Sequence, residues 1–349
     1  MRKTLTITAL AAASVVLLAG CASGQADAGS TSSAAAGSTT NIGFLAAAPR
    51  NDNGLTQYSL AGVQAAVDAD PTLKLTSIVD NVTTSQDQIQ GLESLAADNQ
   101  IVIADSASLN KAVEVVAAKY PDTRFILVAA DLPSFADNVT SVIANVGYPA
   151  MVAGAVAAER SKSKDLGVIA GLELPATSAW YYGMQQGAKL QDPSANVSVT
   201  YTGDFNDVGK AKSAAEAMMA NGIDSIISDL DAGSAGIYQA ADAAPTATDV
   251  YDVFALHCES SPYIVGSGTV SWTKILQDAV SAAAAKNLPG GSVSYGLANG
   301  ALKFEFCPGQ GTDAEKAIAD KVTKQLIAGE ITPDQGVLLP KPDYAQIER

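Results

Sequence analysis

The chain has 349 residues, 48% of them hydrophobic, and a formal net charge of −15. This length accommodates one large or two modest domains in addition to a processed N-terminus. The acidic balance argues against a nucleic-acid partner, because nucleic-acid-binding proteins usually carry a basic surface. A single His and the absence of a Cys-x-x-Cys pair argue against a metal site, and we expect no cofactor.

The N-terminus has the features of a secretory signal. A basic start, "MRK", precedes the apolar run "TLTITALAAASVVLLAG", which is too short to span a bilayer comfortably. Its end, "LLAGC", resembles the lipobox of bacterial lipoproteins, in which the Cys receives a diacylglyceryl group and becomes the first mature residue. We therefore expect residues 1–20 to be a signal peptide and Cys21 to be lipidated; an ordinary Cys after an apolar segment is the alternative.

The next segment, residues 21–40, is rich in Gly, Ser, Ala and Thr and contains no large apolar residue. Such a composition cannot bury enough surface to order itself and is typical of a flexible tether. We therefore expect a folded body held on the extracytoplasmic face of the cell membrane by a lipid anchor.

From residue 41 onward, short apolar runs alternate with Ala-rich helical stretches. The runs are "IGFLAAA", "LTSIVD", "IVIAD", "FILVAA", "SVIANV", "LGVIAG", "VSVTYT", "DSIISDL", "YDVFALH" and "YIVGSG". The helical stretches include 84–98, 107–119, 206–221 and 272–286. Buried β-branched runs separated by helices predict parallel sheets, and ten strands fit two sheets better than one.

The chain is expected to cross between the two sheets more than once. A helix within "NVGYPAMVAGAVAAERSKSKDLGVIAG" separates the two series, and "SVSYGL", "ALKFEF" and a helix at 313–329 return strand material at the end. We place lobe 1 at residues 41–145 plus 268–300, and lobe 2 at 146–267 plus 301–349. Open α/β sheets bind ligands at the carboxyl ends of their strands, which predicts a site between the lobes.

The stretch "RNDNGLTQYSLAG" follows the first predicted strand and begins a helix. A helix N-cap needs only one short polar side chain, and this stretch supplies several. Asp52, Asn53, Thr56 and Gln57 are therefore candidates for contact with a ligand; capping of the helix by Asp52 or Asn53 is the alternative.

Seven segments, in chain order, resemble the basic membrane protein family, the substrate-binding lipoproteins of nucleoside ABC transporters. The first is "NDNGLTQYSLAGV", where the family has D-D-x-S-F-N-Q-x-x-W-x-G. The others are "YPAMVAGAVAAE", "LGVIAGLELPATSAWYYGMQQGA", "VTYTGDFNDVGKAKSAAEAMMANGIDSI", "DAGSAGIYQAA", "VGSGTVSWTKILQDAV" and "VSYGLANGAL". The resemblance implies an α/β, type I periplasmic-binding-protein fold: two Rossmann-like lobes joined by three crossovers, closing on a purine nucleoside and docking on a permease.

The resemblance also implies roles for individual residues. Asp52 and Gln57 match the first motif, and Lys274 matches the family Lys in "SWTK", from which it would reach the ribose. Trp180 would stack on a base and Tyr238 would form an aromatic wall. The alternatives are a cap for Gln57, a solvated helix position for Lys274 and a core position for Trp180.

Several family positions are replaced in this chain. Leu55, Thr56 and Leu60 stand for Phe, Asn and Trp of the first motif, and Asp105, Ser106 and Ala107 follow "IVIA" where the family tends to have Gly and an aromatic residue. His257 and Asn299 stand at acidic positions, and Ala129 stands for an expected Asp unless Asp131 serves. We add to the ligand-binding candidates the residues Asp105, Ser106, Asp131, His257 and Asn299. Because of these changes, a sugar or polyol remains an alternative to a nucleoside as the ligand.

Other classes of function are weighed against solute binding. The acyl-transfer motif G-x-S-x-G is absent, a Ser-His-Asp triad would have to use His257, and "GDFNDVGKA" has neither the spacing nor the Ser/Thr of a P-loop. We therefore expect a monomeric binding protein and no enzyme. A ligand-sensing lipoprotein without transport remains an alternative.

Cys258 and Cys307 lie near strand ends, and the extracytoplasmic setting permits either a disulfide or two free thiols.

Overall fold

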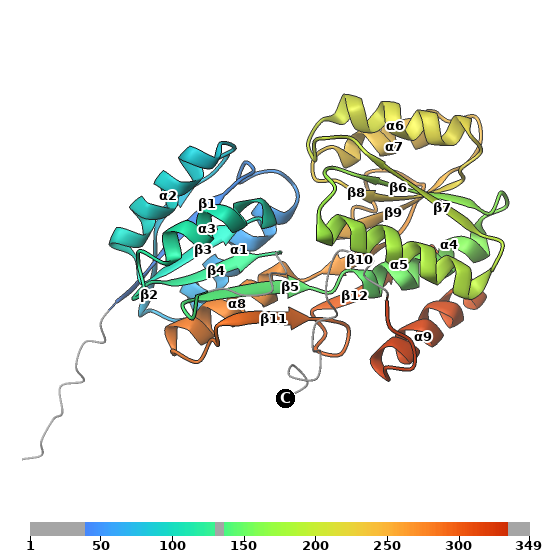
Figure 1. The fold of residues 1–349 in the computed structure, drawn as a ribbon. Coiled ribbons are helices and arrows are strands. Elements are labelled where there is room, and N and C mark those ends of the chain that lie inside the picture. The colour runs from blue at the N-terminus through green and yellow to red at the C-terminus, as the bar shows by residue number, and fades with distance from the viewer. Residues whose placement is uncertain (1–38, 130–135, 334–349) are drawn as a thin grey trace, which may run out of the picture. The chain divides into compact units, whose positions relative to one another are not determined.

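Two six-stranded sheets, each flanked by helices, form the part of the chain that the computed structural model describes, residues 39–129 and 136–333 (Figure 1). The described residues belong to one compact unit. Cys21, residues 21–38 of the predicted tether, Asp131 and residues 334–349 lie outside the described residues, so the expectations for them stay predictions. The last residue of the predicted tether, Thr40, begins the first strand.

The first sheet has the strand order β11-β5-β4-β3-β1-β2, and all its neighbouring strands are parallel. Every residue of β3, "IVIAD", is buried, as expected for a central strand covered on both faces. We call this sheet and its helices lobe 1. Its elements are β1 (Thr40–Ala46), α1 (Leu55–Ala69), β2 (Leu73–Val79), α2 (Ser85–Asp98), β3 (Ile101–Asp105), a 3-10 turn (Ala107–Leu109), α3 (Asn110–Ala117), β4 (Arg124–Val128), β5 (Val139–Ala144), α8 (Trp272–Ala284) and β11 (Gly291–Tyr295).

The second sheet has the order β12-β10-β9-β8-β6-β7, and we call it and its helices lobe 2. Its edge strand β12 pairs antiparallel with β10, whereas the other neighbours are parallel. The elements of lobe 2 are α4 (Gly147–Arg160), β6 (Asp165–Ala170), α5 (Pro175–Gln191), β7 (Asn196–Tyr201), α6 (Val208–Ala220), β8 (Ser225–Asp229), α7 (Ser234–Ala243), β9 (Asp249–Phe254), β10 (Ile264–Val270), β12 (Leu302–Phe306) and α9 (Asp313–Ile327).

The chain passes between the sheets three times: after β5, after β10 and after β11. The lobe limits of the sequence analysis stay a prediction, and β10 extends across residue 268, where one of them was set.

Helix α4, which follows the first crossing, is the most deeply buried helix of lobe 2. It packs against α5 and α9, and its residues from Pro149 to Ala158 are all buried. Small residues permit this packing: a Cβ on Gly187 of α5 would lie 1.8 Å from the carbonyl oxygen of Met151. Arg160, at the end of α4, forms ion pairs with Asp249 of β9 and Glu315 of α9, at 2.8 and 3.1 Å. One residue thereby joins three elements of the lobe.

A disulfide joins Cys258, after β9, to Cys307, after β12. Of the two states that the sequence left open, the structure has the bonded one. Within the described ranges, no helix combines the length and apolar character needed to cross a bilayer.

Candidate functional site

A cavity of about 580 Å³ opens where strands of both sheets end. Its walls are the segments that follow β1, β3 and β5 in lobe 1 and β6, β7, β8 and β9 in lobe 2, so it lies at the carboxyl ends of both sheets. The polar residues that line it are Asp52, Thr56, Asn81, Thr83, Gln88, Asp105, Ser106, Ser108, Asn145, Thr177, Asp204, Asn206, Asp229 and Asp231.

Asp52 holds the first turn of α1 at the edge of this cavity. Its carboxylate accepts hydrogen bonds from the backbone N–H groups of Gly54, Thr56 and Gln57, at 2.9, 3.1 and 3.1 Å. In the structure Asp52 therefore caps the start of α1, because these donors are among those that a helix leaves unsatisfied at its start. Asp52 also lines the cavity, so capping and ligand contact are compatible.

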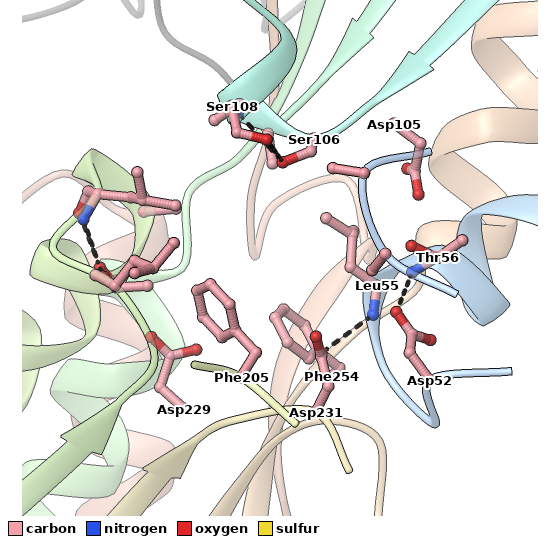
Figure 2. A pocket seen from close by; sticks show the side chains of 18 of the residues that line it. Asp52, Leu55, Thr56, Asp105, Ser106, Ser108, Phe205, Asp229, Asp231 and Phe254 are labelled. Atoms are coloured by element: carbon pink, nitrogen blue, oxygen red, sulfur yellow. Dashed lines mark hydrogen bonds between the residues drawn. The ribbon is translucent and has the colours of Figure 1, made fainter. Parts of the chain in front are cut away.

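A polar contact joins the lobes beside Asp52. The backbone N–H of Leu55 donates to Asp231 Oδ1, at 3.4 Å, from the start of α1 to the loop after β8 (Figure 2). Gly54 makes this approach possible, because a Cβ at its position would lie 1.7 Å from the same oxygen. Glycine is required here by close contact across the site.

Two buried carboxyl groups on the cavity wall have oxygens without a hydrogen-bond partner. Asp105 ends β3 and is 1% exposed, and neither of its carboxyl oxygens is hydrogen-bonded. Asp229 ends β8 and is 2% exposed, and its Oδ2 has no partner. Buried polar atoms are normally hydrogen-bonded, and exceptions in a cavity mark places where a ligand can supply the missing bond.

Burial changes the protonation of these acids. It raises the pKa of Asp105 to about 7; the nearby charge of Asp52 adds to the rise, and the hydroxyls of Ser59 and Thr56 offset part of it. Burial, followed by the charges of Asp52 and Asp105, raises the pKa of Asp231 to about 8. Burial and the charge of Asp231 raise the pKa of Asp229 well above its usual range. Near neutral pH the cavity can therefore present both carboxyl and carboxylate groups.

Aromatic side chains form the apolar part of the wall. Phe205 follows β7 and Phe254 ends β9, and Figure 2 shows both rings between Asp229 and the start of α1. Trp180 packs edge-on against Phe254, with the ring centroids 6.5 Å apart. Trp180 and Trp272 both line the cavity although each is nearly fully buried. The ligand and core interpretations of Trp180 are both compatible with this position.

A second hollow, of about 560 Å³, contains other predicted residues: Asn53, Tyr238 and His257. Here His257 Nε2 lies 3.3 Å from the hydroxyl of Tyr58, and its Nδ1 lies 3.2 Å from Asp252 Oδ2. Tyr238 donates to the other oxygen of Asp252 at 2.6 Å. The hydrogen bond to Asp252 raises the pKa of His257, and burial partly opposes the rise. Both ring nitrogens are engaged, neither by a Ser, so this arrangement is not a Ser-His-Asp triad.

The sequence-predicted ligand residues that the structure describes, all except Asp131, fall into three groups. Asp52, Thr56, Asp105, Ser106 and Trp180 line the main cavity. Asn53, Tyr238 and His257 line the second hollow.

The third group lines neither hollow. Gln57 is exposed on α1, and Lys274 is exposed and paired with Asp278 at 2.6 Å. Asn299 accepts bonds from the backbone of Gly296 and Ala301, which makes it a turn residue. The function proposed below does not rest on these three.

The cavity residues that were not predicted as ligand residues include Phe205, Asp229, Asp231 and Phe254, which carry the proposal below. A signal for them exists in the sequence, because Asp229 and Phe254 lie within the apolar runs "DSIISDL" and "YDVFALH", which were predicted as strands, and the other two follow such runs closely. All four lie at or just after the carboxyl ends of lobe 2 strands, which face the cavity as those of lobe 1 do.

The chain resembles known proteins over nearly all its described length. A family model described as "ABC transporter substrate-binding protein PnrA-like" (Bmp) matches residues 39–334. The ABC transporter nucleoside-binding protein BmpA of Lactococcus lactis subsp. cremoris (strain MG1363) is 25% identical, over 95% of this chain and 98% of that protein. A purine-binding protein of Brucella abortus (strain 2308) is 24% identical, over 84% of this chain and 83% of that protein.

Solved structures bear on the fold. An ABC transporter system solute-binding protein from Aeropyrum pernix K1 matches with a TM-score of 0.76 and 18% identity, over 85% of this chain and 94% of that one. Together with the two sheets and three crossings, this match confirms the predicted periplasmic-binding-protein fold. The match to the family model confirms the predicted family.

Proposed function

The chain belongs to the PnrA-like substrate-binding proteins of ABC transporters, and we propose that its solute is a nucleoside, bound in the cavity between the two lobes. The observation that carries this proposal is the pairing, on one wall, of two Phe rings with the buried carboxyl of Asp229. A nucleoside offers a flat base to the rings and hydroxyl donors to the carboxyl groups. The cavity volume lies within the range of small-molecule sites.

The two lobes have distinct parts in this proposal. The base lies against Phe205 and Phe254 of lobe 2, and ribose hydroxyls donate to Asp229 and Asp231. Thr56 and Ser106 of lobe 1 face the same cavity and supply hydroxyl groups to the ligand. A ligand that touches both lobes favours their approach, which is the usual hinge transition of this architecture.

The family and the N-terminal sequence support a proposal for the cellular setting. We propose that the protein is held by a lipid on Cys21 at the extracytoplasmic face of the membrane and acts as a monomer that delivers its solute to permease subunits. It captures the solute without transforming it. A lipoprotein that senses the solute without transport is the alternative with the same site.

A sugar or polyol is the second candidate ligand, because carboxyl groups and one aromatic face also suit a sugar. The observation that favours it is the replacement of the aromatic residues expected at two first-motif positions by Leu55 and Leu60. Two Phe rings on the cavity wall nevertheless give the nucleoside the better match.

Differential scanning fluorimetry of the protein without residues 1–38 distinguishes a nucleoside from a sugar or polyol. Guanosine, adenosine, inosine, cytidine and uridine are compared with ribose, arabinose and glycerol. A ligand at about 100 times its dissociation constant adds about 2.7 kcal/mol to the free energy of unfolding and raises the melting temperature. Phe205→Ala should weaken a nucleoside more than a polyol. If all five nucleosides leave the melting curve unmoved while a sugar raises it, the nucleoside assignment is wrong.

A further inference from the structure

The charged side chains that line the main cavity all have the same sign. They are Asp52, Asp105, Asp204, Asp229 and Asp231, and the described lining contains no Lys, Arg or His. The basic side chains nearest in sequence to the site have partners elsewhere: Lys274 pairs with Asp278, and Arg50 pairs with Asp80. His257 pairs with Asp252 in the second hollow, which it shares with Asp231 and Tyr58. No described side chain therefore brings positive charge into the main cavity.

Asp105 is the carboxyl group of this cavity for which both oxygens lack a hydrogen-bond partner among the described residues, and the nearby hydroxyls of Ser59 and Thr56 offset the effect of its burial only in part. Its side chain is 1% exposed. The N–H donors of Gly54, Thr56 and Gln57 go to Asp52 instead, and that of Leu55 goes to Asp231. The charge of Asp52 raises the pKa of Asp105, and the charge of Asp105 in turn raises the pKa of Asp231. A buried carboxylate without a partner is costly, and a neighbouring like charge adds to the cost.

A metal ion does not explain this group. Across residues 39–129 and 136–333, no three His, Cys, Asp or Glu side chains come together in a way that could hold a metal. The hydroxyls of Ser59 and Thr56 stabilise the carboxylate only in part. Protonation removes the buried charge in the empty site, and a positively charged group on the ligand would compensate it in the occupied site. The Phe rings on the opposite wall are compatible with a cation, since an aromatic face attracts one.

We propose that the preferred solute is an organic cation of nucleoside size, whose protonated or quaternary nitrogen lies against Asp105. This inference rests on the proposed function, because it places the ligand in the same cavity and adds a charge to it. The hydroxyl groups and the flat ring of the ligand keep the contacts proposed above. Asp229 lies on the lobe 2 wall near Phe205 (Figure 2), and in this proposal it accepts hydroxyl donors and does not anchor the charge.

A consequence concerns protons. Because burial keeps Asp105 partly protonated near pH 7, a cation that pairs with it displaces a proton. The affinity for a cation should therefore rise between pH 6 and pH 8. The pKa values of Asp229 and Asp231, which also face the cavity, are raised as well. Their deprotonation between pH 6 and pH 8 changes the affinity for a cation in the same direction if they lie within reach of its charge.

Matched ligands that differ in charge test the inference. Adenosine is compared by isothermal titration calorimetry at pH 7.5 with 1-methyladenosine, which carries its charge on the base, and with 5′-amino-5′-deoxyadenosine, which carries it on the sugar. We expect one of the two cations to bind at least tenfold more tightly than adenosine. Two matched variants accompany the wild type: Asp105→Asn should reduce that ratio to about one, whereas Asp229→Asn should weaken the cation and adenosine by similar factors.

The outcomes separate the inference from the function on which it rests. If adenosine binds as tightly as both cations, the inference is overturned and the nucleoside assignment stands. If a cation is preferred but Asp105→Asn leaves the ratio unchanged in a variant whose melting curve remains cooperative, Asp105 is not the anchor and the inference is again overturned. If none of the three ligands nor the five nucleosides binds, the proposed function fails first.

Discussion

The hydroxyl of Tyr58 in α1 lies 3.3 Å from Nε2 of His257, so a tyrosine of lobe 1 and a histidine of lobe 2 meet at the edge of the second hollow. Nδ1 of the same imidazole faces Asp252, which also accepts a hydrogen bond from Tyr238. A titratable group therefore lies in a contact between the lobes.

The first prediction concerns the pKa of His257. The hydrogen bond to Asp252 raises it above 6.5, against the opposing effect of burial. Since the pKa is raised in the folded state, the stabilisation is fully present below pH 6.5 and is lost as pH rises through the folded-state pKa. His257 is the only histidine in the sequence, so an NMR titration of an untagged protein reads it without ambiguity. Asp252→Asn should lower the value; a wild-type pKa at or below 6.5 would contradict the assigned contact.

The second prediction concerns Gly54. A Cβ there would lie 1.7 Å from Asp231 Oδ1, so Gly54→Ala must displace the Asp231 side chain or separate it from α1. We expect affinity for the tightest ligand to fall about tenfold, which corresponds to about 1.4 kcal/mol. Gly209→Ala in α6 is the matched control, because its nearest neighbour lies at 3.3 Å and a helical Gly→Ala change raises stability by about 0.5–1 kcal/mol. Unchanged affinity in Gly54→Ala would show that this contact is unimportant for binding.

The third prediction concerns Arg160, which is about one-fifth exposed and bridges Asp249 and Glu315. Arg160→Met leaves two carboxylates facing each other without their partner. We expect a loss of about 3 kcal/mol in the free energy of unfolding, measured by urea denaturation. The control is Lys111→Met, which removes an exposed pair with Glu114 and should change stability by less than about 1 kcal/mol. A loss for Arg160→Met no larger than that of the control would refute a structural role for the bridge.

The fourth prediction concerns the empty site. Because the pKa of Asp105 rises from 3.8 to about 7 on folding, the folded state holds its proton more tightly than the unfolded state. Stability is therefore lost as pH rises from about 4 to about 7, by up to roughly 4 kcal/mol. Asp105→Asn should remove this loss and make the ligand-free protein more stable than wild type at pH 8.

Urea unfolding at pH 5 and pH 8 measures this difference. Asp122→Asn, at an exposed position, controls for the change in net charge. If Asp105→Asn is no more stable than wild type at pH 8, the carboxyl is better solvated than its burial indicates.

The sequence predicted the arrangement of elements closely because the relevant signal is local. The Ala-rich stretch 84–98 became α2, Ser85–Asp98, and the stretch 272–286 became α8, Trp272–Ala284. Apolar runs bounded by polar residues located the strands for the same reason. The antiparallel pairing of β12 with β10 was not foreseen, because a short run such as "ALKFEF" carries no information on the direction of its neighbour.

The site was less predictable, because it depends on where side chains point. The position of Lys274 in a helix was clear, but whether it reaches the cavity depends on competition with Asp278 one turn along the same helix. Phe205 lies in a loop whose path is fixed by lobe 2 as a whole. Asp105 was identified because it follows "IVIA" at a position where the resembled family tends to have another residue, and in the structure it ends a buried strand that the topology brings to the cavity.

The central claim is that a nucleoside-sized solute enters the cavity between the lobes. Intrinsic tryptophan fluorescence can test this claim. Trp180 and Trp272 are the only two tryptophans in the sequence, and both line that cavity. Titration of the soluble body with the nucleosides and the two cationic analogues should give, for at least one of them, a saturable change in tryptophan fluorescence. The dissociation constant should equal the calorimetric one. Calorimetric binding with unchanged tryptophan emission would place the solute elsewhere and contradict the account.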